Sequence, residues 1–597
     1  MLRTIHYLFP LATLGAVVLP AGGAPVAGTP PKAQPRGELA KRIEMDRDRM
    51  LHGGIPQFTS DFILADVTLR PDYPRRFTNY SGDLSGRYIE ALSCMPGDDT
   101  KGGPDNLVSE LIKHQRPDGR FGNPDLRYVA KDIGLDHMAL LWGNGRLLVG
   151  LVENYASNPR PEVLASARKL GDFLLSVHKG CANDAVTAEV KDLAAAGMIC
   201  FSQLIEGLVL LSNVSGEKSY LDGAKMIVPW FPTERGRQHS HGYLTTLRAI
   251  LLLHEATHDA KYLSMVEDLY GDLVRSGDYV IYGGVQELFG GQHDRDEGCS
   301  EGDFLRLSLQ LWRLTEKTEY LDRAEYCFLN HFYANQFSTG DFGHHAYADF
   351  GVKPITGVGR AWWCCTMHAL RSFRDVLDSA VTTGGASVNV NLFTDVVWTD
   401  GSRKITVETC AAPNGNLNTT IAVQKTNKDG LKISVRRPAW TNRVVARING
   451  RTSAFNEHEG YLTFSKTLKR GDRIEVACEP RCEIVKRDGT RLAIKALSAE
   501  PIEGVLRCGP WLMGVDEADN PMFFGEPWRG NQVFLSGKVR VQAAAKGLLE
   551  KNHLHVPCEY IHEGFPGSHE LILRPISERT GHDPCTFAVW LKYSRQP

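Results

Sequence analysis

The sequence predicts a multidomain protein in which a helical region precedes a β region. Apolar residues recur every three or four positions between about Asp46 and Leu377, a spacing typical of amphipathic helices. After about Thr383, short segments of alternating polarity are separated by Asn-Gly and Asp-Gly turns, which is typical of antiparallel strands. A chain of 597 residues is also too long for one hydrophobic core, so two or more domains are expected.

The helical region contains a weak internal repeat. Tyr220-Leu221, Tyr262-Leu263 and Tyr320-Leu321 each follow a long apolar segment and a polar turn, and each opens another helix; residues 158–170 resemble a degenerate fourth copy. The copies lie about 40 to 60 residues apart, which suits helical hairpins with insertions. Such hairpins bury their inner faces in a solenoid or in a closed α/α toroid. We assign residues 46–380 to this helical domain.

The β region is expected to form antiparallel sandwiches. We assign residues 381–490 to one β-sandwich, and residues 491–597 to a second sandwich or an extension of the first. The clearest strands are residues 387–393, 404–408, 419–424, 431–435, 444–448, 461–464 and 473–476.

The N-terminal residues have the layout of a secretory signal peptide. Arg3 precedes an apolar stretch from Tyr7 to Leu19, and small residues follow at 21–24. The apolar stretch is too short for a membrane span, which needs about 20 residues. We therefore expect residues 1–24 to be a signal peptide, residues 25–45 to be a disordered lead-in, and the protein to be secreted or periplasmic. No later segment is long and apolar enough to span a membrane.

Composition narrows the set of partners. A net charge of −2 without a long basic run disfavours nucleic acid as a partner. The 13 cysteines would permit disulfides in an exported protein, and the pairs considered are Cys478 with Cys482, and Cys508 with Cys558 or Cys585. A homodimer is compatible with the sequence.

Glu297-Gly298-Cys299 and the adjacent pair Cys364-Cys365 are the most informative residues for chemistry. If the helices bring them together, three sulfurs and one carboxylate meet, a ligand set that suits tetrahedral Zn²⁺. Because Cys364 and Cys365 are adjacent, we expect an irregular backbone if both bind one ion. Two alternatives stay open. The cysteines are ordinary buried apolar residues, or Cys364 and Cys365 form a strained vicinal disulfide.

Glu287 is a candidate general acid. It follows the Gly283-Gly284 turn and lies beside Phe289, and apolar surroundings raise the pKa of a carboxyl group. An ordinary surface glutamate is the alternative. The tandem His344-His345 is expected to lie on a solvated turn rather than to bind a metal.

Several motifs, in the same order along most of the chain, resemble the β-L-arabinofuranosidase group of glycoside hydrolases, family 127 and its relatives. Glu287-Leu288-Phe289 stands where that family has Glu-Ala-Phe, and Glu297-Gly298-Cys299 where it has Glu-Thr-Cys. The other matching segments are residues 80–91 (YSGDLSGRYIEA), 115–120 (QRPDGR), Cys364-Cys365, 388–393 (VNVNLF), 460–464 (GYLTF), 469–472 (KRGD) and 507–510 (RCGP).

The resemblance implies an (α/α)6 barrel, followed by antiparallel β-sandwich domains, that acts on a glycan with retention of configuration. It implies a zinc ion held by Glu297, Cys299, Cys364 and Cys365. Cys364 would attack the anomeric carbon, and Glu287 would act first as an acid and then as a base. A four-ligand zinc site is usually structural, so catalysis would require one thiolate to loosen.

The sugar-contacting residues match the family less well than the catalytic ones. Where the family has a histidine that contacts the sugar, this chain has Arg146, which suggests a carboxylated sugar because arginine binds carboxylates with two hydrogen bonds. A surface arginine on a helix is the alternative. The second sugar-contacting histidine corresponds to His239 or His241.

Two other functions remain open at this point. One is a non-catalytic carbohydrate-binding protein that keeps zinc for structure. The other is an α/α-barrel polysaccharide lyase or unsaturated-uronide hydrolase, which would prefer uronates.

Overall fold

The computed structural model describes residues 32–70, 72, 79–95, 104–191, 195, 197–291, 295–345, 360–384, 387–517, 520–535, 540–542, 553–578 and 587–595. The expected signal peptide lies outside these residues, and so does Cys585. Within them, every helix is too short or too polar to cross a membrane.

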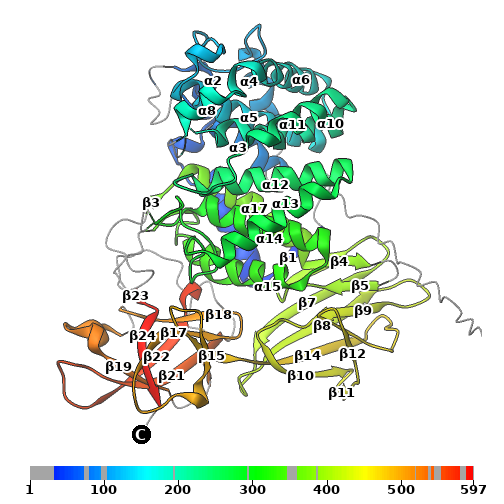
Figure 1. The fold of residues 1–597 in the computed structure, drawn as a ribbon. Coiled ribbons are helices and arrows are strands. Elements are labelled where there is room, and N and C mark those ends of the chain that lie inside the picture. The colour runs from blue at the N-terminus through cyan, green and yellow to red at the C-terminus, as the bar shows by residue number, and fades with distance from the viewer. Residues whose placement is uncertain are drawn as a thin grey trace, which may run out of the picture.

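Six helices form a closed inner ring in which each packs against the next and the last packs against the first. They make up much of the helical region at the top of Figure 1. In ring order they are α3 (Asp83–Cys94), α5 (Leu135–Ser157), α10 (Leu204–Ser215), α12 (Ser240–Thr257), α14 (Gly298–Thr315) and α17 (Trp363–Ala380). Their side chains are mostly buried along their whole length, as expected for helices with neighbours on all sides.

A second layer of helices covers the ring, one against each inner helix. These are α1 (Gly37–Leu51) on α17, α2 (Ser60–Thr68) on α3, α6 (Pro161–Ser176) on α5, α11 (Lys218–Ile227) on α10, α13 (Ala260–Arg275) on α12, and α15 (Thr318–Tyr326) on α14. The prediction of an α/α barrel is therefore confirmed, in the closed form rather than as a solenoid. Shorter helices complete the region: α4 (Asp105–Leu111), α7 (His178–Cys181), α8 (Asp184–Val190), α9 (Ile199–Ser202), α16 (Tyr333–Asn335) and the π-helical η5 (Cys327–Phe332).

The repeat found in the sequence marks the starts of outer helices. Tyr220, Tyr262 and Tyr320 lie in the first turn of α11, α13 and α15, and all three are buried. The phenol groups of Tyr220 and Tyr320 donate hydrogen bonds to carboxylates of the preceding outer helix, Asp172 at 3.0 Å and Glu267 at 2.7 Å. Each tyrosine thus packs into the core while its hydroxyl group links neighbouring outer helices.

The interior of the ring is charged as well as apolar. The guanidinium of Arg146 contacts Glu90 at 2.5 Å and Glu206 at 2.6 Å, and that of Arg248 contacts Glu206 at 3.3 Å and Asp303 at 2.9 Å. Buried charges are tolerated only when they are paired, and removal of one partner costs about 3–5 kcal/mol. The inner helices are therefore held in register by ion pairs in addition to apolar packing.

The first β unit is a two-sheet sandwich that follows α17 directly (Figure 1). Its seven-stranded sheet is ordered β1 (Ala33–Pro35), β6 (Val396–Thr399), β7 (Lys404–Ala411), β8 (Leu417–Lys425), β14 (Arg473–Pro480), β10 (Thr441–Ile448) and β11 (Arg451–Thr452). Its five-stranded sheet is ordered β12 (Asn456–His458), β13 (Tyr461–Thr463), β9 (Lys432–Arg436), β5 (Ser387–Val390) and β4 (Val381–Gly384). The burial of β8 alternates residue by residue, so one face of the strand is in the core. The barrel and the sandwich share one continuous apolar core.

The second β unit is a single ten-stranded sheet rather than another sandwich. Its strands are β15 (Cys482–Val485), β16 (Arg491–Ala493), β17 (Ile502–Cys508), β18 (Trp511–Asp516), β19 (Gln532–Leu535), β20 (Arg540–Gln542), β21 (His553–Ile561), β22 (Ser568–Pro575), β23 (Phe587–Ala588) and β24 (Trp590–Arg595). Because β18 pairs with β17 as well as with β22, six of these strands close into a ring. The unit begins near 481, earlier than the expected boundary at 490.

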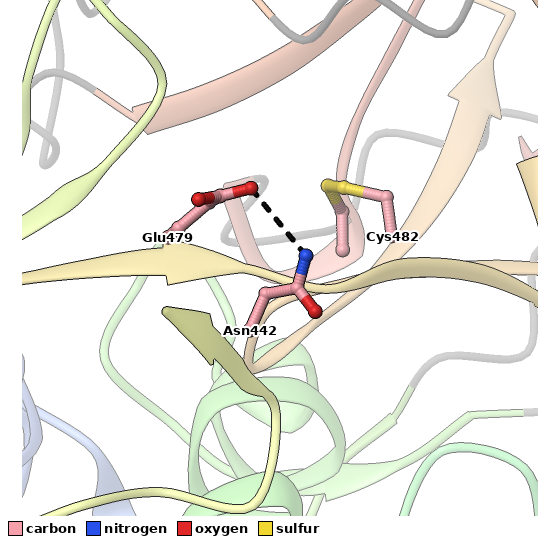
Figure 2. Close-up of a disulfide and its surroundings, with 4 residues drawn as sticks. Asn442, Glu479 and Cys482 are labelled. Carbon is pink, nitrogen blue, oxygen red and sulfur yellow. Dashed lines mark hydrogen bonds between the residues drawn. A yellow bond between two sulfur atoms is a disulfide. The ribbon is translucent and has the colours of Figure 1, made fainter. Parts of the chain in front are cut away.

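A disulfide joins Cys482 to Cys508, so none of the three pairings considered from the sequence forms. The two residues lie directly opposite each other on the antiparallel strands β15 and β17, whereas Cys478 and Cys558 remain free thiols. Figure 2 shows the disulfide beside Asn442 of β10 and Glu479 of β14, close to the point where β14 leads into β15 of the second unit. The Asn442 amide donates to Glu479 at 3.4 Å. The register of β15 against β17 decides which cysteines pair, and the spacing of cysteines in the sequence does not reveal that register.

The expected lead-in is ordered from residue 32 onward, so the prediction of disorder up to residue 45 is wrong. Residues 33–35 form β1, which pairs with β6 of the sandwich, and residues 37–51 form α1, which packs against α17. Arg42 on α1 is fully buried and donates to the main-chain carbonyls of Tyr333 and Ser577. The N-terminal segment thus connects the barrel to both β units.

The remaining two strands, β2 (Gly343–His344) and β3 (Arg360–Ala361), form a two-stranded sheet of their own.

Asn330 in η5 ties the barrel to the second β unit. Its buried amide donates to the carbonyls of Tyr326 and Pro510, both at 2.8 Å, and accepts from the amide of Leu512 at 2.7 Å. An alanine would leave the groups of Pro510 and Leu512 buried without these partners.

We expect Asn330→Ala to destabilise the protein by roughly 3 kcal/mol, because each unsatisfied buried group costs about 1–3 kcal/mol. Thermal and urea unfolding of both proteins measure the loss. Asn456→Ala, at an exposed position of edge strand β12, is the matched control and should change stability by less than about 0.5 kcal/mol. Equal stability of the Asn330 variant and the native protein would contradict the role of this contact.

Candidate active site

The candidate site lies where the N-termini of three inner helices meet. Glu297 is the N-cap residue of α14 and Cys299 is in its first turn, Cys364 and Cys365 are in the first turn of α17, and His239 is the N-cap residue of α12. Helix N-termini carry partial positive charge and unpaired N–H groups, so they stabilise thiolates and carboxylates. The local fold therefore favours anionic side chains at this position.

The four expected ligands converge on one point. One ligand atom from each of Glu297, Cys299, Cys364 and Cys365 lies within 4.8 Å of the others. The sulfurs of Cys299 and Cys365 are 3.7 Å apart. Cys299 and Cys365 are fully buried, whereas Cys364 retains 9% exposure. Cys364 is thus the most accessible of the three thiols.

The backbone at Cys364 and Cys365 is regular helix, so the expectation of an irregular backbone is wrong. In a helix, each Cα–Cβ bond tilts toward the N-terminus, so side chains of the first turn can reach a point beyond the helix end. Two adjacent residues can then approach one ion from the same turn. Both are free thiols, which also rules out the vicinal disulfide.

The three thiols differ in acidity. Hydrogen bonds from Cys299 and then Cys365, with the charge of Arg87, hold the pKa of Cys364 well below its usual value despite burial. Burial raises the pKa of both Cys299 and Cys365. Cys364 is therefore the thiol that ionises first, and it is also the least buried of the three.

His239 pairs with the carboxylate ligand. Its Nε2 lies 3.3 Å from Glu297, which also accepts a hydrogen bond of 2.6 Å from Ser300. Burial alone would raise the pKa of Glu297, but the imidazoles, His239 first, lower it. The Nδ1 of His239 is buried and has no hydrogen-bond partner among the described residues.

Glu287 reaches the site because its strand-like segment pairs with the start of α12. The amide of Ser240 donates to the carbonyl of Glu287 at 2.9 Å, and Leu288 bridges to His239. A carboxylate oxygen of Glu287 lies within 4.8 Å of ligand atoms of His239 and Glu297. The surroundings are not only apolar as expected, because Arg295 forms an ion pair with Glu287.

Both ring nitrogens of His241 are engaged within the protein. Arg87 can only donate, so the contact of 2.6 Å between its guanidinium and Nε2 makes Nε2 the acceptor. The Nδ1–H then donates to Asp303. Burial and the charge of Arg87 lower the pKa of His241 to about 4, which keeps the ring neutral. Of the two histidines considered from the sequence, His239 is the one with a free nitrogen.

Arg87 and Asp303 were not singled out from the sequence. Arg87 is 2% exposed, and its guanidinium lies 3.8 Å from the sulfur of Cys299. Asp303 accepts from Arg248 at 2.9 Å and Thr245 at 2.9 Å, and contacts His368 at 3.3 Å. Charged residues in the second turns of the buried inner helices, Arg87 on α3 and Asp303 on α14, are the signal that would have found them.

Arg146 is not a surface residue, so that alternative is wrong. It is 1% exposed, and its guanidinium is held between Glu90 and Glu206. These two carboxylates already accept from the guanidinium N–H groups of Arg146 that would bind an acidic sugar.

The expected solvated turn at His344-His345 is also wrong, because both residues are buried and His345 contacts Asp296.

The donor set fits a metal ion. Three sulfurs and a carboxylate meet in a buried space. Arg87, His239 and His241 lie beside this cluster and leave the four ligand atoms close to one another. The clusters His241–Asp303–His368 and Asp296–Glu301–His331 also bring together groups that can bind metals, but they lack sulfur. A buried metal site at Glu297, Cys299, Cys364 and Cys365 is therefore compatible with the structure.

An α/α barrel with acidic and thiol groups at one end, joined to β units, is an architecture that glycosidases use. Comparisons with known proteins narrow this class. The model of the β-L-arabinofuranosidase GH127 catalytic domain matches residues 76–378, and that of the GH127 middle domain matches residues 387–479. The chain belongs to glycoside hydrolase family 127 and is a β-L-arabinofuranosidase-like glycoside hydrolase.

Solved structures share the fold at low identity. The GH127 β-arabinofuranosidase BT3674 has a TM-score of 0.72 and 16% identity over 96% of this chain and 98% of its own. Ara127N, a GH127 β-L-arabinofuranosidase from Geobacillus stearothermophilus T6, has a TM-score of 0.69 and 14% identity over 94% of this chain and 100% of its own. A further glycoside hydrolase has a TM-score of 0.65 and 15% identity over 94% and 96%. No curated protein sequence matches this chain.

We expect iodoacetamide to alkylate Cys364 before Cys299 and Cys365 in metal-free protein. Its lowered pKa means that the thiolate persists as the pH falls below about 8.5, the usual thiol value, so the rate should change little between pH 8 and pH 7. Peptide mapping by mass spectrometry identifies the modified residue.

Buried Cys94, whose pKa burial raises, is the internal control and should stay unmodified. Modification of Cys299 or Cys365 first would contradict the assignment of Cys364 as the reactive thiol.

Proposed function

We propose that this protein is an exported, zinc-dependent, retaining exo-glycoside hydrolase that removes β-L-arabinofuranose-type sugars from a glycan. The observation that carries the proposal is the convergence of Glu297, Cys299, Cys364 and Cys365 on one buried point, with Cys364 the most exposed thiol. Family membership supports the sugar class, and the names of two solved relatives agree with it.

Glu297, Cys299, Cys364 and Cys365 would hold the zinc ion, which as a Lewis acid favours the ionised form of the thiols bound to it. In the first step the sulfur of Cys364 bonds to the anomeric carbon, and the bond from that carbon to the leaving oxygen breaks. Glu287 gives its proton to that oxygen. In the second step, a water molecule attacks the same carbon, the carbon–sulfur bond breaks, and Glu287 takes the proton of the water. Two inversions give overall retention.

Two features of the site must change during this reaction. Cys364 must leave the cluster to bond carbon, and its greater exposure and lowered pKa suit it to that role better than Cys299 or Cys365. The ion pair between Arg295 and Glu287 must open so that Glu287 can donate a proton. His239, which lies beside both Glu287 and Glu297, is the residue we assign to a sugar hydroxyl group.

A non-catalytic glycan-binding protein with structural zinc is the second candidate. The closed set of four protein ligands favours it, because structural zinc sites have no open position. It predicts that Glu287→Gln leaves glycan affinity unchanged and that no sugar is released. Membership in a glycoside hydrolase family gives no support to the lyase.

Export and assembly are also proposals. The sequence of residues 1–24 and the disulfide between Cys482 and Cys508 support an oxidising compartment. Mass spectrometry of the mature N-terminus tests cleavage, and light scattering measures whether the protein forms a homodimer.

We expect Cys364→Ala to lower kcat/KM on an aryl β-L-arabinofuranoside more than about 1000-fold, because it removes the nucleophile. Glu287→Gln should cost about 100- to 10,000-fold, the range for a general acid or base. Both variants should keep the native thermal stability within a few degrees.

Azide sharpens the test of Glu287. In Glu287→Ala, azide needs no base, so it should replace water and release a glycosyl azide of retained configuration, seen by NMR. Full activity in either the Cys364 or the Glu287 variant would contradict the proposed mechanism. A product of inverted configuration would contradict the covalent intermediate.

We expect purified protein to contain one zinc ion per chain, measured by plasma mass spectrometry. Removal by a chelator should abolish activity, and added zinc should restore it, because thiolate ligation depends on the ion. The Cys299→Ser variant should lose zinc, whereas Cys94→Ser, at a buried cysteine outside the cluster, should keep it. Full activity of metal-free protein would exclude a zinc-dependent mechanism.

A further inference from the structure

Arg87 is the cationic side chain that contacts the sulfur cluster. Its guanidinium makes three separate contacts: Nε with Asp83 at 2.8 Å, one terminal nitrogen with His241 at 2.6 Å, and the other with the sulfur of Cys299 at 3.8 Å. The side chain is 2% exposed. A guanidinium this deep in the protein, aimed at a thiol, is not explained by packing alone.

The orientation of Arg87 is fixed from two sides. Asp83 lies one turn earlier on α3 and is itself held by the indole N–H of Trp142 at 2.9 Å. His241 offers Arg87 only its Nε2 lone pair, because Asp303 holds the opposite N–H. Each hydrogen bond to Arg87 is thus supported by a further one, so the nitrogen that faces Cys299 has little freedom to turn away.

The negative charge of the four ligands makes a nearby cationic side chain favourable. Three thiolates and one carboxylate carry four negative charges, and a divalent ion offsets two of them. Burial makes the remaining charge costly, since an uncompensated buried ion loses its hydration. Helix N-termini supply only partial charge. Arg87, which also pairs with Asp83, places a cationic N–H donor within hydrogen-bond distance of one sulfur.

We propose that Arg87 is a positioning residue that keeps the Cys299 sulfur on the metal, so that Cys364 is the thiolate that dissociates and attacks. A hydrogen bond to a metal-bound sulfur offsets part of its charge and orients it, as groups that contact metal ligands commonly do. Cys364 is also the less buried of the two cysteines, which suits it better to bond with a substrate. The inference rests on the metal centre proposed above.

The chain offers a matched control in Arg371. It lies on inner helix α17, is 8% exposed, and pairs with Asp375 one turn along at 2.8 Å, just as Arg87 pairs with Asp83. Arg371 also forms an ion pair with Glu90 in the barrel interior. Loss of either arginine removes one buried positive charge from an inner helix, but only Arg87 contacts Cys299.

The test compares zinc affinity in the full-length protein by competition with a chromophoric chelator, using Arg87→Met, Arg87→Lys and Arg371→Met. Arg87→Met should weaken zinc binding about 10- to 100-fold, the usual effect of losing a group that contacts a ligand. Arg87→Lys should recover part of the loss, because it keeps the charge but not the forked geometry. Arg371→Met should bind zinc as the native protein does. If Arg87→Met folds poorly, Asp83→Asn/Arg87→Met removes both charges of the pair.

A cobalt(II)-substituted sample gives a second readout. The sulfur-to-cobalt charge-transfer bands should shift in Arg87→Met and not in Arg371→Met, because only Arg87 contacts a ligand sulfur. Native affinity and spectrum in Arg87→Met, or an equal loss in Arg371→Met, would overturn the proposal. Failure of the native protein to bind zinc would overturn the metal centre itself, and this outcome is distinct from the other two.

Discussion

Closure of the inner helical ring is the constraint on which the site depends. Because inner and outer helices alternate, the starts of α12, α14 and α17 lie at one end of the barrel, with the first turn of α3 beside them. Residues far apart in sequence, such as Cys299 and Cys364, are neighbours for this reason alone. The same geometry places helix N-termini around a cluster of anionic ligands, where their partial charges stabilise it.

A continuous series of polar contacts runs from the site into the charged interior of the helical ring. Contacts run from Cys299 through Arg87, His241 and Asp303 to Arg248, and from there to the buried pairs of Arg146. Each group in this series is fixed by the next. The side chains around the site are therefore oriented by hydrogen bonds as well as by apolar packing.

The periodic parts of the fold could be predicted from sequence. Tyr220, Tyr262 and Tyr320 indicated helical hairpins because local repeats depend on neighbouring residues. β1 could not be found, since three residues form a strand only when β6 supplies the partner. The disulfide between Cys482 and Cys508 depends on strand register for the same reason. The four ligands were recognised by type, but Arg87 was missed because its contacts come from three different helices.

Zinc K-edge X-ray absorption of the native protein tests the central claim most directly, because it counts the atoms around the ion. Ligation by Glu297, Cys299, Cys364 and Cys365 predicts three sulfurs at about 2.3 Å and one oxygen at about 2.0–2.2 Å. A shell with two sulfurs or fewer, or one of nitrogen and oxygen only, would contradict the account.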